Sequence, residues 1–313
     1  MTAPVLKPDS GALERAVMVL RAGGLVAMPT ETVYGLACDA SNGEAVARLY
    51  AAKGRPSFNP LIAHVAPGEM DQREARWDGR AASLVASYWP GPLTVVLPFA
   101  RETGTVSELA RAGLDSIGLR QPSHPVALEL IAAFGGPLVA PSANPSGRIS
   151  PTTAAHVAAD LGDKVDLILD GGPCEVGLES TIVSFLGSRA ALLRPGGLDP
   201  GVIEKHLGER LLTGQDSPEA PSSPGQLLRH YSPRAALRLD ADGPREGEVF
   251  LGFGTKKGAR NLSPKANLAE AAANLFTMLR ELDASASAIA VAPIPREGLG
   301  LAINDRLKRA ATR

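Results

Sequence analysis

The first two hundred residues alternate between two spacings of hydrophobic positions. Apolar residues three and four positions apart predict helices over 13–20, 45–52, 123–134 and 152–161. Short, continuous apolar runs predict buried strands over 25–28, 61–65, 93–97, 167–169 and 181–185. Ser150 and Pro151 are expected to open the last of these helices as N-cap and first helical residue. Strands mixed with helices over this length predict one α/β domain.

A smaller region with its own pattern follows. The stretch at 213–224 is polar and proline-rich with no apolar period, which indicates a linker. Beyond it the pattern predicts, in order, strand 248–252, helix 268–282, strand 288–292 and helix 299–310. This order favours a small doubly wound, Rossmann-like unit. We therefore expect domains at 10–199 and 234–313, joined by a linker over 200–233.

Composition and charge narrow the class of protein. The 313 residues carry a net charge of −1, so no global positive field suggests a histone-like nucleic-acid binder. The charge is −4 over residues 1–200 and +3 over 201–313. No apolar run approaches the ~18–20 residues that span a bilayer, and we expect neither a membrane segment nor a signal peptide. Because Cys38 and Cys174 cannot form a disulfide framework, a cytoplasmic location is expected.

Two segments of the first domain combine polar side chains with prolines that fix the backbone. Pro29-Thr-Glu-Thr-Val-Tyr-Gly35 directly follows the strand at 25–28, where α/β proteins bind ligands, although a polar β-turn explains it equally well. Lys53-Gly-Arg-Pro-Ser-Phe-Asn-Pro60 sets a lysine beside an arginine fork, which suits a polyphosphate. The alternative for this second segment is a solvated basic loop.

Two further segments supply hydroxyl groups. Ser116 and Arg120 share one face of a predicted strand, so Arg120 can bind an anion or pair with an aspartate. Pro141-Ser-Ala-Asn-Pro-Ser-Gly147 and the following Ser150 precede a predicted helix. Small hydroxyl residues that enter a helix N-terminus can bind phosphate, and the alternative is an ordinary capped loop.

The signatures of several other chemistries are missing. Gly252-Phe-Gly254 is not a dinucleotide fingerprint, because Lys257 stands where the third glycine belongs, and no phosphate-loop pattern or hydrolase elbow occurs. The five histidines are scattered, so no metal site is predicted, and His64 alone is more typical of a core residue. The residues by themselves indicate an α/β enzyme with an anion-binding cleft that contains Lys53, Arg55, Arg120 and Arg194.

Taken in order, these segments resemble one family. The motifs are Pro29-Thr-Glu-Thr-Val-Tyr-Gly, Lys53-Gly-Arg-Pro-x-x-Asn-Pro, Gly118-Leu-Arg-x-Pro, Ala140-Pro-Ser-Ala-Asn-x-Ser-Gly and Glu179-Ser-Thr-Ile-Val. Together they are similar to the YrdC-type domain of L-threonylcarbamoyladenylate synthases. His230-Tyr-Ser-Pro233 and the second α/β unit resemble the long, two-domain form of that family. The resemblance implies a YrdC-like twisted mixed sheet with helices, followed by the smaller Rossmann-like domain.

The resemblance also implies a reaction. L-threonine, bicarbonate and ATP give threonylcarbamoyl-AMP and pyrophosphate, and other transferase proteins then pass the threonylcarbamoyl group to the adenosine beside the anticodon of certain tRNAs. Mg²⁺ is expected to accompany ATP, bound mainly through phosphates. The reaction depends on positioning and charge neutralisation more than on a strong base, which agrees with cations and hydroxyls in place of a catalytic triad.

Roles for individual residues follow from the same resemblance. Lys53 is expected to be catalytic by neutralising phosphate charge in the transition state. L-threonine is expected to contact Thr32, His64, Arg120, Ala140 and Ser180. ATP is expected to contact Arg55, Asn59, Ser116, Ser142, Ser150, Arg194 and Tyr231, the last reaching back from a linker that folds over the active site. No protein ligand for a metal is expected.

Two other functions stay open on the sequence alone. An RNA-binding module would place the same arginines on backbone phosphates, although the charge of −4 over residues 1–200 argues against it. As part of the synthase function, a weak contact with tRNA is kept as an expectation. A carbamoyl-transfer enzyme of hydrogenase maturation carries a related domain, but two cysteines cannot form its zinc motifs.

Overall fold

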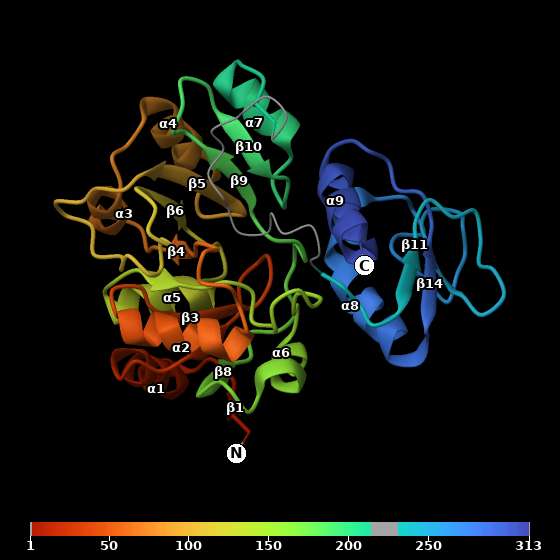
Figure 1. Ribbon diagram of the computed structural model, residues 1–313, viewed down its shortest axis with the longest axis horizontal. Helices are drawn as coiled ribbons and strands as arrows, with labels where there is room; N and C mark the ends of the chain where they lie inside the picture. The colour runs from red at the N-terminus through yellow and green to blue at the C-terminus, as the bar shows by residue number, and fades with distance from the viewer. Residues whose placement is uncertain (1, 214–230, 313) are drawn as a thin grey trace.

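Two α/β domains lie side by side in the computed structural model, which describes residues 2–213 and 231–312 (Figure 1). The middle of the expected linker, residues 214–230, lies outside the described residues. The expected linker, 200–233, begins with a helix, α7 (Pro200–Leu207). This helix packs against α4 (Gly79–Tyr88) of the first domain. Leu212 also pairs with Ala191 of the first sheet.

The first domain is built on a ten-stranded sheet. Its strands are β1 (Val5–Leu6), β2 (Val26–Met28), β3 (Gly35–Asp39), β4 (Ile62–His64), β5 (Leu93–Pro98), β6 (Ser116–Arg120), β7 (Leu138–Val139), β8 (Leu167–Leu169), β9 (Thr181–Ser184) and β10 (Ala191–Arg194). Across the sheet the order is β1-β8-β2-β3-β7-β4-β6-β5-β9-β10. Parallel pairs such as β4 with β6 adjoin antiparallel pairs such as β5 with β6, so the expected mixed sheet is confirmed.

Both faces of this sheet are covered. The helices are α1 (Ser10–Arg21), α2 (Gly43–Lys53), α3 (Glu69–Glu74), α4, α5 (Pro125–Phe134) and α6 (Ala154–Leu161). Successive residues of β2 enter different apolar clusters, with Ala27 in one and Val26 in the other. Helices α1 and α5 pack on the cluster that contains Val26. Helices α2, α4 and α6 pack on the cluster that contains Ala27. This two-sided burial explains why the strands appear in the sequence as continuous apolar runs.

The start of α6 differs from the prediction. Thr153 is the N-cap, because its backbone is extended and its Oγ1 accepts a hydrogen bond from the backbone N–H of His156 at 3.2 Å. The hydroxyl of Ser150 instead donates to the carboxylate of Glu179. The expected capping role of Ser150 and Pro151 is therefore wrong, and Ser150 is a buried residue of the loop before the helix.

The second domain has a four-stranded sheet in which every neighbouring pair is parallel. Its elements are β11 (Ala236–Arg238), β12 (Val249–Gly252), β13 (Arg260–Asn261), α8 (Leu268–Ser285), β14 (Ala288–Val291) and α9 (Leu299–Ala311). The strand order is β11-β14-β12-β13. Helices α8 and α9 pack on each other and lie between this sheet and the first domain (Figure 1).

The two domains touch through α8 and the loops beside α6. At Gly177, with φ of +70°, a Cβ atom would lie only 2.6 Å from the Cα of Ala273, so glycine lets the helix backbone approach closely. Across the same contact, the hydroxyls of Thr152 and Thr277 lie 2.9 Å apart. Arg280 of α8 pairs with Asp160 at 2.6 Å. The second domain therefore supports loops of the first domain directly.

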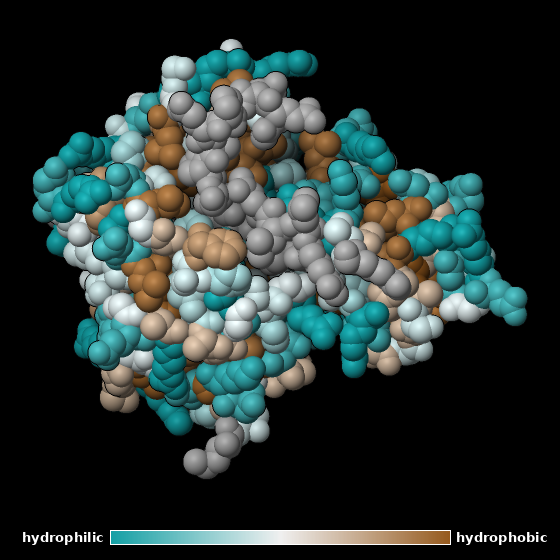
Figure 2. Space-filling view, viewed as in Figure 1, coloured by the Kyte–Doolittle hydropathy of each residue, from teal (hydrophilic) through white to brown (hydrophobic). Residues whose placement is uncertain are grey.

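The surface shows no continuous apolar band on the face drawn in Figure 2, where apolar residues form separate patches among hydrophilic ones. Exposed apolar side chains such as Met18 and Phe58 belong to distant segments. Among the described residues, no helix combines the length and apolar character needed to cross a bilayer.

Candidate functional site

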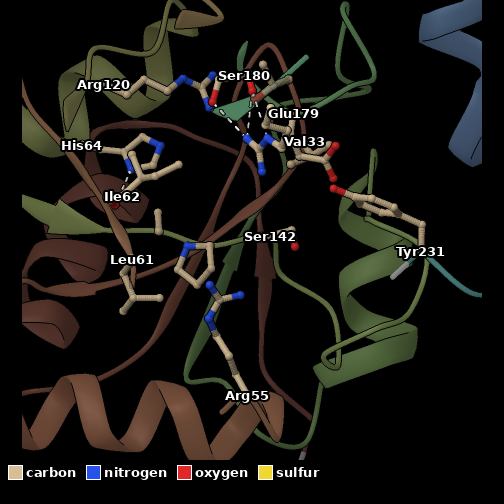
Figure 3. A pocket seen from close by; sticks show the side chains of 14 residues that line it. Val33, Arg55, Leu61, Ile62, His64, Arg120, Ser142, Glu179, Ser180 and Tyr231 are labelled. Carbon is tan, nitrogen blue, oxygen red and sulfur yellow. Dashed lines mark hydrogen bonds between the residues drawn. The ribbon is translucent and has the colours of Figure 1, made fainter. Parts of the chain in front are cut away.

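A cavity lies at one edge of the first sheet (Figure 3). It encloses about 540 Å³, including its open mouth. Its lining combines cationic, hydroxyl and apolar side chains: Thr32, Val33, Arg55, Leu61, Ile62, His64, Arg120, Ala140, Pro141, Ser142, Glu179, Ser180, Arg194 and Tyr231. The first domain provides all of them except Tyr231, which lies just before the second domain.

The strand register explains why these residues meet. His64 and Arg120 are paired at the carboxyl ends of the parallel strands β4 and β6. Strand β9 begins beside the first residue of β5 at this same edge, directly after Ser180. Strand β10 runs antiparallel to β9 and therefore ends there, at Arg194. Ligand sites of α/β sheets typically form at such an edge.

The structure brings together most of the residues singled out in the sequence. Those that line the cavity are Thr32, His64, Arg120, Ala140, Ser180, Arg55, Ser142, Arg194 and Tyr231. Those that do not line it are Lys53, Asn59, Ser116 and Ser150. Ser116 lies at the opposite end of β6 from Arg120, next to Pro98, whereas the other three are buried directly behind residues of the wall.

Arg120 forms a buried ion pair that the sequence did not assign. Its Nη2 donates to Oε1 of Glu31 at 2.7 Å, and the side chains are 5% and 6% exposed. The other oxygen of Glu31 accepts a hydrogen bond from the backbone N–H of Ser123. Nε of Arg120 points to the carbonyl of Gly91, and Nη1 makes no hydrogen bond within the described part of the chain. Glu31 thus fixes the guanidinium and leaves one donor nitrogen for a ligand.

His64 lies beside Arg120 as a neutral ring. Its Nδ1 is 3.2 Å from the carbonyl oxygen of Ile62, and since a carbonyl only accepts, the proton of this bond belongs to Nδ1 (Figure 3). Burial and the charge of Arg120 lower the pKa of His64 to about 3. The neutral ring therefore carries its lone pair on Nε2 at physiological pH.

A second buried guanidinium lies beside Ser180. Arg194 donates through Nε and Nη2 to the carbonyl oxygen of Ser180 at 3.2 and 2.9 Å. Nη2 also lies 3.2 Å from Oγ of Ser180, which in turn is 2.7 Å from Oγ1 of Thr94. Burial lowers the pKa of Arg194 from its ordinary value, although a guanidinium remains charged at neutral pH.

Two cations come from the end of α2 and the loop that follows. Arg55 faces the cavity and donates to the carbonyl of Pro60 at 3.0 Å. Lys53 is 3% exposed, and its ammonium donates to the carbonyl oxygens of Ser142 and Asn144. Burial and the charge of Arg55 lower the pKa of Lys53. Lys53 thus supports the hydroxyl loop at 141–147 from behind the cavity wall.

A chain of polar groups links the cavity to the second domain. The Ser150 hydroxyl donates to Oε1 of Glu179 at 2.5 Å, and Oε2 of Glu179 accepts from Nε of Arg306 at 2.9 Å. The guanidinium of Arg306 lies 5.2 Å from the ring centroid of Tyr231. Tyr231 is 1% exposed, has φ of +61°, and stacks on Phe276 of α8. One wall of the cavity therefore rests on the second domain.

Sequence analysis missed Glu31, Glu179 and Arg306 as members of this site. Both glutamates stand inside motifs that the sequence analysis singled out. A carboxylate repels anions, so neither glutamate was assigned to the expected anion site. Arg306 lies 127 positions from Glu179, in a helix whose charged residues suggest a solvated face. No sequence signal connects the two.

Comparisons with known proteins agree over both domains. A family model named Sua5_yciO_yrdC and described as "Telomere recombination" matches residues 18–196, and one described as "Threonylcarbamoyl-AMP synthase, C-terminal domain" matches residues 201–312. The chain is 38% identical to the threonylcarbamoyl-AMP synthase of Bacillus subtilis, covering 98% of this chain and 94% of that protein. It is also 38% identical to the Pyrococcus abyssi synthase, covering 93% and 92%.

A solved structure agrees as well. The crystal structure of P. abyssi Sua5 complexed with L-threonine matches with a TM-score of 0.88 at 36% identity, covering 99% of this chain and 97% of that one. The full-length match favours a synthase over the RNA-binding and hydrogenase-maturation alternatives. The chain belongs to the two-domain, Sua5-type threonylcarbamoyl-AMP synthases, in which a YrdC-type domain precedes the family's C-terminal domain.

Proposed function

We propose that the cavity binds L-threonine, bicarbonate and ATP together and joins them into threonylcarbamoyl-AMP with release of pyrophosphate. The observation that carries this proposal is the presence of two buried guanidinium groups, Arg120 and Arg194, in one cavity, with a neutral histidine beside Arg120. A small zwitterion and a polyphosphate each require such a cation. The relative from P. abyssi was crystallised with L-threonine, which supports an amino-acid subsite in the same fold.

The amino-acid subsite is proposed at Arg120, with Thr32, His64, Ser180 and the backbone of Ala140 around it. Arg120 is the partner for the threonine carboxylate, because Nη1 is a donor held in a fixed orientation by the Glu31 ion pair. His64 is the acceptor for the threonine amine, since its neutral ring carries a lone pair on Nε2.

The nucleotide subsite is proposed at Arg55, Ser142 and Arg194, which we call the nucleotide wall, with Tyr231 at its edge. Asn59, Ser116 and Ser150 stay predictions for this subsite, and all three lie outside the cavity lining. The catalytic role of Lys53 also stays a prediction. Its ammonium gives two of its three protons to carbonyl oxygens, which leaves the third proton for a phosphate oxygen.

The chemistry requires two bond-forming steps. The threonine nitrogen attacks the carbon of CO2 formed from bicarbonate, giving a carbamate and releasing a proton. A carbamate oxygen then attacks the α-phosphorus of ATP, and the bond from that phosphorus to the bridging oxygen of pyrophosphate breaks. Charge accumulates on phosphate oxygens, which buried guanidinium groups stabilise strongly.

Mg²⁺ is proposed to enter with ATP, held by phosphate oxygens and water. The described residues contain no cluster of three or more histidine, cysteine or acidic side chains able to hold a metal. Glu31 and Glu179, the carboxylates at the site, are both bonded to arginines. This donor set fits a cation that the nucleotide itself carries. When bound, Mg²⁺ would neutralise phosphate charge.

The remaining proposals concern the surroundings of the reaction. Transferase proteins that consume threonylcarbamoyl-AMP are proposed as partners, together with a weak contact with tRNA. A cytoplasmic location is proposed as well. Both cysteines are buried free thiols, which agrees with a reducing compartment.

Labelled bicarbonate tests the proposed function. The purified protein is incubated with ATP, Mg²⁺, L-threonine and ¹³C-bicarbonate. The nucleotides are then separated, and their masses are measured by mass spectrometry. We expect an adenylate that contains both threonine and one ¹³C atom. An adenylate of threonine without the labelled carbon would assign the cavity to ordinary amino-acid activation instead.

His64 should show no titration in the pH range of the assay. With a pKa of about 3, its ring stays neutral from pH 6 to 8, so titration of His64 does not change the activity over this pH range.

For His64→Ala we expect the KM for threonine to rise about tenfold, the effect of one lost hydrogen bond, with the KM for ATP unchanged. His206→Ala is the matched control. An activity of the wild-type enzyme that falls below pH 7 in step with His64 protonation, followed by NMR, would contradict this account.

A further inference from the structure

Arg306 of the second domain is a completely buried arginine beside the proposed active site. Its side chain is 0% exposed, and its Nε donates to Glu179, which lines the cavity. Nη1 donates to the carbonyl of Pro195 at 2.7 Å and to Asp305 at 2.9 Å. Nη2 is buried without a hydrogen-bond partner among the described residues. Arg306 itself does not line the cavity, so any effect on the reaction acts through its neighbours.

Glu179 is the neighbour through which Arg306 can act. Its carboxylate stands next to Ser180 and Arg194 in a cavity proposed to hold a triphosphate. Burial raises the pKa of Glu179, but the charges of Arg306 and Arg194 outweigh burial and lower this pKa to about 2. Glu179 is therefore an anion at every pH the enzyme meets, and only a buried counter-charge keeps it from repelling phosphate.

Three more groups contact this ion pair. Glu179 accepts the hydroxyl proton of Ser150 on its other oxygen, so the direction of this hydroxyl depends on the carboxylate. Nη1 of Arg306 also donates to the carbonyl of Pro195, the residue that follows Arg194 in the loop after β10. The ring of Tyr231 lies under the guanidinium. A single side chain of the second domain thus contacts Tyr231 and the loop next to Arg194, and it acts on Ser150 through Glu179.

From these contacts we infer that Arg306 is a positioning residue of the synthase reaction, which neutralises and orients Glu179 so that the nucleotide wall accepts ATP. The inference rests on the proposed function, because it takes the ligand of this wall to be a polyphosphate. It also gives the second domain a part in the reaction: the domain supplies the counter-charge that completes the site.

The test compares Arg306→Met with Arg306→Met/Glu179→Gln. Methionine has similar length without charge and leaves Glu179 as a buried carboxylate without its ion-pair partner. We expect the KM for ATP in the single variant to rise on the order of tenfold at pH 8, because of repulsion between anions, with a smaller rise at pH 6 as Glu179 becomes protonated. In the double variant the carboxylate is gone, so ATP affinity should recover and its extra pH dependence should disappear.

Two controls separate this inference from simple loss of packing. Lys308→Met removes a cation from the exposed side of the same helix and should change neither the KM for ATP nor its pH dependence. Arg306→Lys keeps a charge near Glu179 without the fork, so it should retain more ATP affinity than Arg306→Met. Thermal unfolding of each variant shows which of them are folded, and Arg306→Gln, which also removes the charge, carries the test if Arg306→Met does not fold.

The outcomes distinguish the inference from the proposed function. If the wild-type enzyme releases pyrophosphate only with threonine and bicarbonate, the proposed function holds and the variants test Arg306. A double variant no better than Arg306→Met, with a pH dependence parallel to wild type, would assign Arg306 a packing role and overturn the inference. If Arg306→Gln carries the test, ATP affinity and pH dependence like those of wild type overturn it. Wild-type protein without threonine-dependent release would instead remove the proposed function itself.

Discussion

Arg120→Ala should lose threonine affinity by about one to two orders of magnitude while ATP affinity survives. The loss corresponds to a charge-assisted hydrogen bond worth about 1.5–3 kcal/mol. ATP is proposed to contact Arg55, Ser142 and Arg194 rather than Arg120, so we expect its binding not to depend on the Arg120 guanidinium. Isothermal titration of each substrate separately measures both affinities. Equal losses for ATP and threonine would contradict the assignment of Arg120 to the amino-acid subsite.

The control for Arg120 must deal with the charge left behind. Removing one partner of a buried ion pair costs about 3–5 kcal/mol of folding free energy, because Glu31 stays buried without its counter-charge. Arg120→Ala/Glu31→Gln removes that charge and should unfold at a higher temperature than Arg120→Ala, yet still fail to bind threonine. Arg76→Ala removes an exposed arginine of the same domain and should leave both affinities unchanged.

Lys53→Ala should abolish most adenylate formation, with about a 100-fold loss of kcat or more, the effect expected when one stabilising charge is removed from a transition state. Ligand affinities should change only modestly. Single-turnover measurement of pyrophosphate release, beside titration of ATP, separates the two effects. Wild-type turnover would remove Lys53 from the mechanism.

A second variant separates a catalytic role of Lys53 from a purely supporting one. Its ammonium holds the carbonyls of Ser142 and Asn144, so a purely supporting role predicts that ATP affinity falls together with turnover as the loop shifts. Lys53→Arg keeps a cation that can still donate to carbonyls and should preserve the loop. Low turnover with normal ATP affinity in both variants supports a catalytic contact.

The sequence predicted the buried core of the fold better than its connections. Strands such as β8 were predicted with their observed bounds, because two-sided burial produces continuous apolar runs. The short strand β3 was missed, since its five residues begin with glycine and end with aspartate directly after a polar loop. Helix α7 lies inside the range assigned to the linker, where Pro200 occupies the first helical turn behind the N-cap Asp199.

The candidate site was predictable where motifs adjoin strand ends, and less so where burial decides. Thr32, His64 and Arg120 follow or end strands that meet at one edge, so they meet in space as expected. The burial of Lys53 is visible in hindsight, because it continues the buried face of α2 after Leu49 and Tyr50 at helical spacing. The ion pair of Glu179 with Arg306 joins two domains, and no local pattern encodes such a contact.

The central claim is that this cavity joins threonine, bicarbonate and ATP in one reaction. The most direct measurement is pyrophosphate release by the purified protein with all three substrates, and with threonine or bicarbonate omitted in turn. Release that needs both threonine and bicarbonate is the predicted result. Release that is indifferent to threonine, or no release from folded protein with all substrates present, would contradict the account.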